Sequence, residues 1–339
     1  MNELLLFTAS FVTSFAGVAA FRFFVSKHAM LDVPNDRSLH ETPMPRGGGV
    51  VIVLVSLLLY CFISIYLTHG ISWGYLAGAL LVASISWLDD LFSVSSIIRF
   101  SVHSVAAVLV IADLGYLSTI YVPGTGITLH LGTIGIAATF LWIVWMINAY
   151  NFMDGIDGIA GLQAVLASAG WMIFAFISGY DSIYLFAGIL LFANLGFLIH
   201  NWSPAKIFMG DVGSAFLGFT FAALPAIALK EKPENSRILP FIAISFIWFF
   251  LFDTILTLTF RLMKRRKVWV AHREHIYQRL VISGRSHEFV AILYGSLTCV
   301  VIIAAIGFAA FNGIFGLFLI FIVAISTAAL VLTGFRKIY

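Results

Sequence analysis

The chain has 339 residues, of which 61% are hydrophobic and only 10% are charged, and its formal net charge is +3. Soluble proteins carry roughly a quarter charged residues, so this composition excludes a soluble globular protein. A bilayer core needs about 20 apolar residues per spanning helix, and runs of that length recur along the sequence. We therefore predict an all-α polytopic membrane protein, built as a single transmembrane domain over residues 1–339, with no nucleic-acid partner.

Eleven apolar segments are predicted to span the membrane as helices. The first has neither a basic n-region nor a small-residue cleavage site, so we expect a retained helix rather than a signal peptide. Residues 121–132 alternate apolar and polar side chains after a Pro-Gly turn, which predicts a small periplasmic hairpin before the fifth segment. In chain order the segments are 4–26, 48–68, 72–90, 99–117, 133–151, 157–178, 182–202, 213–229, 238–261, 288–310 and 313–335.

The lysine and arginine residues predict the orientation. With the N-terminus outside, only Lys230, Lys232 and Arg237 would face outside, and the other 16 of the 19 Lys and Arg residues would face inside. This asymmetry agrees with the positive-inside rule. We therefore predict a protein of the bacterial cytoplasmic membrane with its N-terminus out and its C-terminus in. The sequence leaves open whether it forms a homodimer.

Acidic side chains gather at the inner ends of the predicted helices. Charged groups at membrane depth are costly and are functional candidates, whereas solvated loop acids would scatter over both faces. Their one-sided distribution predicts an active site on the cytoplasmic face. The acids on that face are Asp32, Asp36, Asp89, Asp90, Asp154, Asp157, Asp211 and Glu274.

Asp89 and Asp90 are adjacent at the end of the third segment, in WLDDLFS. Two neighbouring carboxylates repel each other unless a cation lies beside them, so the pair predicts a divalent metal ion or a strongly basic partner. A charged helix end at the membrane interface is the simpler alternative.

Two further motifs place acids among glycines at expected helix starts. In NAYNFMDGIDGIAG, Asp154 and Asp157 would share a face if residues 151–158 begin the sixth helix, and the glycines would let a ligand approach the backbone. In FMGDVGSAFLGF, Asp211 begins a helix whose free N–H groups attract phosphate, where a carboxylate can hold Mg²⁺. The simpler alternative for these acids is helix capping, with Ser214 as a further cap.

A basic segment follows the ninth predicted helix, with seven Lys and Arg residues in 264–285. Attraction to anionic lipid accounts for the run 264–267. His272 and His275 are instead expected to meet a phosphate or pyrophosphate. Their cationic surroundings should lower both imidazole pKa values unless a phosphate is bound.

Together these motifs supply acids for a hard metal ion, glycines for close phosphate approach, and basic side chains for anionic charge. This is the equipment of phosphoryl transfer, with a lipid phosphate and a cytosolic nucleotide-linked donor as suitable substrates. The alternative from another class is a secondary transporter, but its site would lie near the membrane midplane on broken helices. A phosphatidyl-alcohol synthase would need its acids at other spacings.

The order of these motifs resembles that of the polyprenyl-phosphate N-acetylhexosamine-1-phosphate transferases, glycosyltransferase family 4. The resemblance implies ten or eleven helices and Mg²⁺-dependent transfer of a sugar-1-phosphate from a UDP-N-acetylhexosamine to undecaprenyl phosphate, releasing UMP, with Mn²⁺ as the substitute ion. It also implies a role in starting O-antigen, within lipopolysaccharide biosynthesis, or another cell-surface polymer of cell wall biogenesis. The matching segments are DVPNDRSLHETPMPRGGG, LDD, NAYNFMDGIDGIAG, NWSPAKIFMGDVGSAFLGF and HREHIYQRL.

The histidine loop, HREH followed by IYQRL, resembles the WecA and WbpL branch of this family more than the MraY branch, whose histidines are contiguous. An MraY-like phospho-N-acetylmuramoyl-pentapeptide transferase is therefore the alternative. The family often has a further acid or lysine after the aspartate pair, where this sequence has Ser93.

The resemblance also implies roles for individual residues. Asp89 and Asp90 would lie by the lipid phosphate and the metal, and Asp211 would bind Mg²⁺ directly. Asp253 matches a recurrent acid for which the sequence suggests no role. The residues implied to face the donor are Asn151 with the catalytic pair Asp154 and Asp157, then Asn201 and Phe208 at the uracil, and Arg46, His272, Arg273 and His275 at its anionic part.

One role within the family is disfavoured on physical grounds. Asp89 matches a residue proposed as the base that deprotonates the lipid phosphate. The second pKa of a phosphate monoester is about 6, so this nucleophile is largely dianionic near neutral pH without a base. We therefore expect Asp89 to act electrostatically, beside Asp90.

Overall fold

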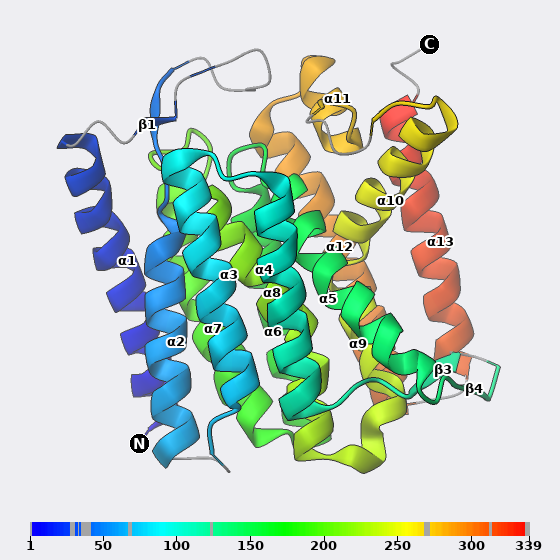
Figure 1. Cartoon of the computed structure of the whole chain (residues 1–339). Helices are drawn as coiled ribbons and strands as arrows, with labels where there is room; N and C mark the ends of the chain where they lie inside the picture. The colour runs from blue at the N-terminus through cyan, green and yellow to red at the C-terminus, as the bar shows by residue number, and fades with distance from the viewer. Residues whose placement is uncertain are drawn as a thin grey trace.

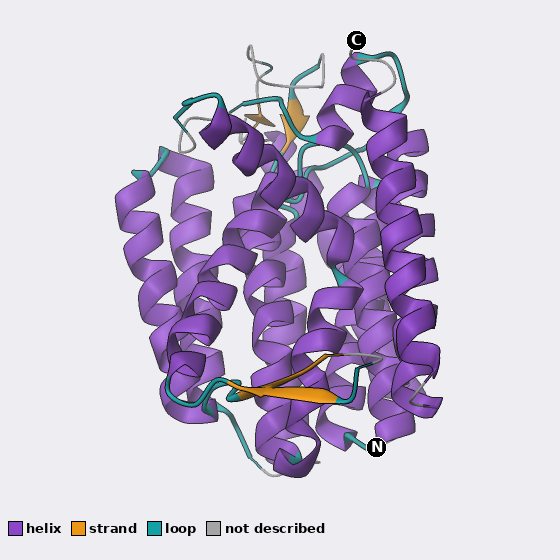
Figure 2. Ribbon diagram, turned by 90° about the vertical axis from the view of Figure 1, so that its right-hand side faces the viewer, coloured by secondary structure: helices purple, strands orange, loops and turns teal. Residues whose placement is uncertain are grey.

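The computed structural model describes residues 2–27, 31–32, 34, 42–66, 70–122, 125–267, 272–311 and 314–335. Within these ranges the chain is a bundle of long helices with two short two-stranded sheets (Figures 1 and 2). Nine of the described helices are long and apolar enough to cross a membrane, and a bent pair would make a tenth span. The predicted class, an all-α multi-pass membrane protein, is confirmed.

Every predicted span is occupied by helix, while the number that cross the bilayer and their orientation stay predictions. The elements are α1 (Glu3–Lys27), β1 (Leu31–Asp32), β2 (Met44–Pro45), α2 (Gly49–Tyr66), α3 (Trp73–Phe92), α4 (Ser96–Leu114), β3 (Thr119–Val122), β4 (Ile127–His130), α5 (Ile134–Phe152), α6 (Ile159–Ser178), α7 (Asp181–Asn201), α8 (Gly210–Glu231), the 3₁₀ helix η1 (Pro233–Ile238), α9 (Leu239–Phe246), α10 (Trp248–Met263), α11 (Ile276–Ile282), α12 (His287–Phe311) and α13 (Ile314–Phe335).

Helix α8 forms the centre of the bundle. Of its apolar window, 94% is buried, against at most 61% in the other candidate spans. Small residues allow this packing, because a Cβ built on Gly49 of α2 would lie 2.3 Å from the Cα of Gly213 in α8. Such contacts between small residues bring helix backbones close together in membranes. The start of α8 is thereby fixed against α2.

The span predicted at 238–261 is broken. Helices α9 and α10 meet at Ile247 with a bend of 77°. The Phe246 carbonyl accepts a hydrogen bond from Gln163 Nε2 of α6 at 2.8 Å, and Thr298 of α12 donates to Gln163 Oε1 at 3.1 Å. A backbone group released by a break at membrane depth needs such a partner. The bend therefore depends on tertiary contacts that hydropathy does not reveal.

The predicted hairpin is confirmed, with β3 and β4 antiparallel and Thr119 opposite His130. It lies at the end of the bundle where α1 begins, whereas β1 and α11 lie at the opposite end (Figures 1 and 2). Because successive long helices run in alternating directions, α3, α5 and α7 all end near the start of α8, on the side of α11. The acids of the predicted motifs are carried to that one end.

Candidate active site

Asp90, at the end of α3, caps the start of α8. Its Oδ1 accepts a hydrogen bond from the Asp211 N–H at 3.0 Å, and its Oδ2 accepts one from the Val212 N–H at 3.1 Å. Ser214, the further cap of the simpler alternative, does not cap this helix, because its hydroxyl donates to the Gly210 carbonyl at 3.2 Å. The carboxylate of a neighbouring helix supplies the cap instead and faces the positive end of the α8 dipole.

Two arginines lie among the three carboxylates at this point. Arg46 Nη2 lies 2.7 Å from Asp90 Oδ1 and 2.7 Å from Asp211 Oδ1. Arg99 Nη1 contacts Asp89 Oδ2 and lies 3.4 Å from Asp211 Oδ2. Of the two partners predicted for the aspartate pair, the strongly basic one is present, while the divalent metal ion stays a prediction. We call Asp89, Asp90, Asp211, Arg46 and Arg99 the carboxylate cluster.

Arg99 is a member that sequence reasoning missed as a site residue. It lies in the first turn of the otherwise apolar α4, ten residues after Asp89. Asp89 also closes the turn between the two helices, since its Oδ1 accepts from the Val94 N–H at 2.7 Å. A lone arginine one turn into a membrane helix, just after an acid pair, was the available signal.

The residues of the cluster fit a divalent cation by donor chemistry. Among the described residues, no group of three His, Cys, Asp or Glu side chains is arranged to hold a metal ion. Oxygens of Asp90 and Asp211, from two helices, nevertheless converge on a single cationic nitrogen of Arg46. Carboxylate oxygens are the ligands that Mg²⁺ prefers. Asp90 and Asp211 are thus the residues that would hold Mg²⁺.

Asp154 and Asp157 lie in a loop and not on a helix. Helix α5 ends at Phe152 and α6 begins at Ile159, so residues 151–158 do not begin the sixth helix, and the condition for a shared helix face is not met. Gly158 has φ of +75°, a left-handed conformation that cannot continue an α-helix. The two carboxyl groups therefore have separate surroundings.

Burial raises the pKa of the Asp154 carboxyl to about 7, with a further contribution from the negative charge of Asp211. Asp157 shows the opposite shift. Although burial opposes it, the His287 imidazole beside the carboxyl and a hydrogen bond from the Ala205 N–H lower the pKa of Asp157. His287, 3.4 Å from Asp157, is a second residue that the sequence did not indicate. One carboxyl is thus poised to carry a proton near neutral pH while the other stays ionised.

The glycine expected to admit a ligand beside Asp154 instead accommodates a side chain. A Cβ on Gly155 would lie 2.2 Å from the Tyr277 hydroxyl, which donates to the Phe152 carbonyl at 2.9 Å. The helix α11, which follows the histidine loop, is thereby fastened to the loop that carries Asp154.

Asn201 is buried at the end of α7, with both ends of its amide engaged. Its Oδ1 accepts from the Gly158 N–H at 3.1 Å, and its Nδ2 donates to the Ile207 carbonyl at 3.0 Å. Asn151 lies half-buried in the last turn of α5. Both residues border the loop with Asp154, and their contact with a nucleotide stays a prediction.

Phe208 belongs to a segment that runs beside Arg46. Its N–H donates to the Pro45 carbonyl at 2.8 Å, and its carbonyl accepts from the Gly48 N–H at 3.0 Å. This pairing carries Arg46 to the start of α8. The rest of the first motif, at residues 33 and 35–41, lies outside the described residues.

The histidine loop contacts the same region. The rings of His272 and His275 stack with centroids 5.0 Å apart. Burial, with help from His275 and Arg261, lowers the pKa of His272 to about 4, which confirms the predicted direction for this ring. His275 is buried beside Asp253, and Arg273 is half-buried between the histidines in sequence. Residues 268–271 lie outside the described residues.

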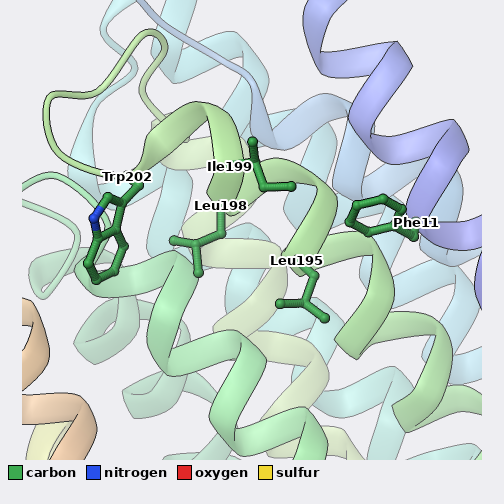
Figure 3. Close-up of a pocket in the computed structure, with 5 residues that line it drawn as sticks. All are labelled: Phe11, Leu195, Leu198, Ile199 and Trp202. Carbon is green, nitrogen blue, oxygen red and sulfur yellow. The ribbon is translucent and has the colours of Figure 1, made fainter.

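A groove of about 440 Å³ lies between α1 and α7, lined by Phe11, Leu195, Leu198, Ile199 and Trp202 (Figure 3). Its lining is apolar, so it does not suit a charged nucleotide-sugar. The Trp202 ring packs against Gly158. The groove therefore reaches the edge of the loop that carries Asp157 but is separate from the carboxylate cluster.

The chain is similar in sequence to known proteins. Residues 72–229 match the family described as glycosyl transferase family 4, a range that includes the carboxylate cluster except Arg46. A probable undecaprenyl-phosphate N-acetylglucosaminyl 1-phosphate transferase of Bacillus subtilis is 28% identical over 300 residues, covering 88% of this chain and 83% of that protein.

Two further relatives carry related names. A phospho-N-acetylmuramoyl-pentapeptide-transferase of Streptococcus uberis is 30% identical over 214 residues, covering 59% of this chain and 63% of that protein. A decaprenyl-phosphate N-acetylglucosaminephosphotransferase of Mycobacterium tuberculosis is 29% identical over 317 residues, covering 84% of this chain and 77% of that protein.

Proposed function

Because the chain belongs to glycosyl transferase family 4, within the polyprenyl-phosphate N-acetylhexosamine-1-phosphate transferases, we propose that it catalyses this sugar-1-phosphate transfer. The acceptor that we propose is undecaprenyl phosphate, and the donor is a UDP-N-acetylhexosamine. The products are undecaprenyl-diphospho-sugar and UMP. The convergence of Asp89, Asp90 and Asp211 on two arginines is the observation that supports this assignment most strongly.

The proposed reaction forms one bond and breaks one. An oxygen of the acceptor phosphate attacks the phosphorus that carries the sugar, and the bond from that phosphorus to the oxygen of UMP breaks. UMP leaves with this oxygen as part of its phosphate. Such transfers depend mainly on positioning and on neutralisation of charge, which Arg46 and Arg99 supply from within the chain.

Mg²⁺, when bound, would supply further neutralisation of phosphate charge. Asp90 holds the start of α8 and thereby orients Asp211 beside it. Asp89 holds Arg99 at the cluster, in keeping with an electrostatic role rather than that of a base. Asp154, whose pKa is raised to about 7, is the carboxyl suited to exchange a proton with a phosphate near neutral pH.

We place the active site on the cytoplasmic face of a bacterial inner membrane. This placement rests on the predicted charge asymmetry, and it gives access to a cytosolic UDP-sugar. The product would start O-antigen or another cell-surface polysaccharide. The second candidate is the MraY-like reaction, which the relative from Streptococcus uberis favours. The secondary transporter is disfavoured, because the acids gather at one end of the bundle.

The experiment is an assay of UMP formation by the purified protein with undecaprenyl phosphate and Mg²⁺. A panel of UDP-N-acetylhexosamines and UDP-N-acetylmuramoyl-pentapeptide separates the two candidate reactions. We expect UMP with at least one N-acetylhexosamine donor, and loss of activity on chelation that returns with Mg²⁺ or Mn²⁺. UMP from the pentapeptide donor alone would establish the MraY-like reaction, and no UMP from any donor would contradict the proposal.

A further inference from the structure

Asp253 is a fully buried carboxyl in α10, below the histidine loop, and is 0% exposed. Each of its described polar partners can donate a hydrogen bond. Its Oδ1 accepts from the Ile276 N–H at 2.9 Å and from the Thr257 hydroxyl at 3.1 Å. Its Oδ2 accepts from the Tyr277 N–H at 3.2 Å and from the Tyr294 hydroxyl at 2.6 Å.

The fifth partner of Asp253 is His275, whose Nδ1 lies 3.2 Å from Oδ1. A carboxyl group surrounded by donors satisfies them all only as a carboxylate, which has no proton of its own to place. Nδ1 of His275 must then carry the proton that faces Asp253. The hydrogen bond made by one ring nitrogen thus sets the state of the other.

Within the described residues, the ring meets Asp253 at Nδ1, and the Gln278 N–H in the first turn of α11 also faces the His275 side chain in a capping box. The remaining nitrogen, Nε2, makes no hydrogen bond to the described residues. The ring is 2% exposed and is held from both sides, by His272 at 5.0 Å between centroids and by Phe152 at 6.3 Å. Rotation of the ring is therefore restricted. Nε2 is the nitrogen left to meet a ligand beside the end of α5.

The backbone of the loop is fixed as firmly as the ring. Asp253 binds the first two N–H groups of α11, and the Tyr277 hydroxyl ties α11 to the end of α5. Tyr294 brings α12 to the same carboxylate. Asp253 therefore joins α10, α11 and α12 around one imidazole.

We propose that Asp253 is a positioning residue for His275. It holds the imidazole as the Nδ1–H form and presents Nε2 to the anionic part of the donor. That Nε2 binds the UDP-sugar rests on the proposed function, whereas the control of the His275 ring by Asp253 does not. A carboxylate behind a histidine fixes both the tautomer and the orientation of the ring in many sites.

The test uses ¹⁵N-histidine-labelled protein without substrate, with the His275→Gln variant to identify the resonances of His275. We expect Nδ1 of His275 to be protonated in the wild-type protein. In Asp253→Asn, the amide NH₂ is a hydrogen-bond donor that faces partners which are themselves donors. An unprotonated Nδ1 of His275 could accept from this NH₂, so the population with a proton on Nδ1 should fall. Tyr294→Phe removes one hydrogen bond but keeps the carboxylate, and it should leave the tautomer unchanged.

Kinetics supply the second readout. Asp253→Asn should raise the KM for the UDP-sugar roughly ten-fold or more with a smaller change in kcat, in the range seen for other carboxylates behind a histidine. Tyr294→Phe should stay within about three-fold of wild type.

Three outcomes would overturn the proposal. They are protonation of Nε2 alone in the wild-type protein, an unchanged tautomer in Asp253→Asn, and a loss of activity in Asp253→Asn that is confined to kcat. The wild-type spectrum decides the question even if Asp253→Asn fails to fold. If the expected tautomers are found but the wild-type protein forms no UMP, the proposed function fails and the control of the ring by Asp253 stands.

Discussion

At the scale of single residues, the balance of charge in the carboxylate cluster is set by two arginines. Arg46 bridges Asp90 and Asp211, while Arg99 bridges Asp89 and Asp211. Three formal negative charges face two positive ones, so the cluster keeps an excess of negative charge. That excess favours the binding of a divalent cation.

Arg99 provides a direct test of this charge balance. Arg99→Gln should lower the rate of UMP formation roughly a hundred-fold or more, the cost of losing a donor aimed at developing charge. Arg99→Lys keeps the positive charge but lacks the planar guanidinium with its paired N–H donors. Its rate of UMP formation should lie between that of the wild-type protein and that of Arg99→Gln. Arg237→Gln, near the ring of Tyr121 at the hairpin end, is the matched control and should keep full activity. A wild-type rate in Arg99→Gln would remove this residue from the active site.

Asp154 gives the protein a predicted pH dependence of stability. Its pKa is raised from 3.8 to about 7 in the folded protein, first by burial and then by Asp211. The folded state therefore retains a proton that the unfolded chain releases. The stability gained by holding this proton is complete below about pH 4, declines as the pH rises towards 7, and is absent above that. Asp154→Asn should thus raise the melting temperature more at pH 8 than at pH 5, as measured by thermal unfolding in detergent. Equal increases at both pH values would contradict the assignment.

At the scale of elements, the start of α8 shows why particular backbone positions are glycine. Gly210 has φ of +78°, and a Cβ there would lie 2.7 Å from Asp90 Oδ2. Gly126, in the hairpin turn, has a similar φ of +72° but no atom within 4 Å of a built Cβ. The two positions therefore separate backbone strain from displacement of the Asp90 carboxylate.

Gly126→Ala should cost about 1–2 kcal/mol from backbone strain alone and keep full activity. Gly210→Ala should cost more and should also reduce UMP formation at limiting Mg²⁺, because Asp90 must move. Both effects are measured by thermal unfolding and by the UMP assay. If the two variants behave alike, the position of Asp90 against α8 does not matter for activity.

Some elements could be predicted from the sequence and others could not. Hydropathy predicted every long helix, since about 20 apolar residues leave few alternatives in a bilayer. The loop at residues 153–158 and the break at Ile247 were not predicted. Tyr277 in one case and Gln163 in the other fix these backbones from distant parts of the chain. The motifs identified the acids, but not Arg99, His287 or the partners of Asp253, because proximity depends on packing.

At the scale of the whole molecule, the predicted orientation can be tested with single cysteines. Cys61 and Cys299, half-buried in α2 and α12, would first be replaced by serine. Ser93→Cys lies in the exposed turn beside the cluster, and Thr125→Cys lies in the exposed turn of the hairpin at the opposite end. An impermeant thiol reagent should label Ser93→Cys only from the cytoplasmic side and Thr125→Cys only from outside. The reverse pattern would overturn the orientation and the cytosolic source of the donor.

Transfer of a sugar-1-phosphate to a lipid phosphate at the carboxylate cluster can be followed with a labelled donor. The most direct measurement uses a UDP-N-acetylhexosamine with ³²P only in the phosphate next to the sugar, together with undecaprenyl phosphate. We predict that the label enters the lipid fraction and that the released UMP is unlabelled. Asp211→Asn should fold normally but transfer no label, while Asp113→Asn, at the opposite end of the bundle, should transfer it as the wild-type protein does. Label released as UDP, or transfer by Asp211→Asn at the wild-type rate, would contradict sugar-1-phosphate transfer at this cluster.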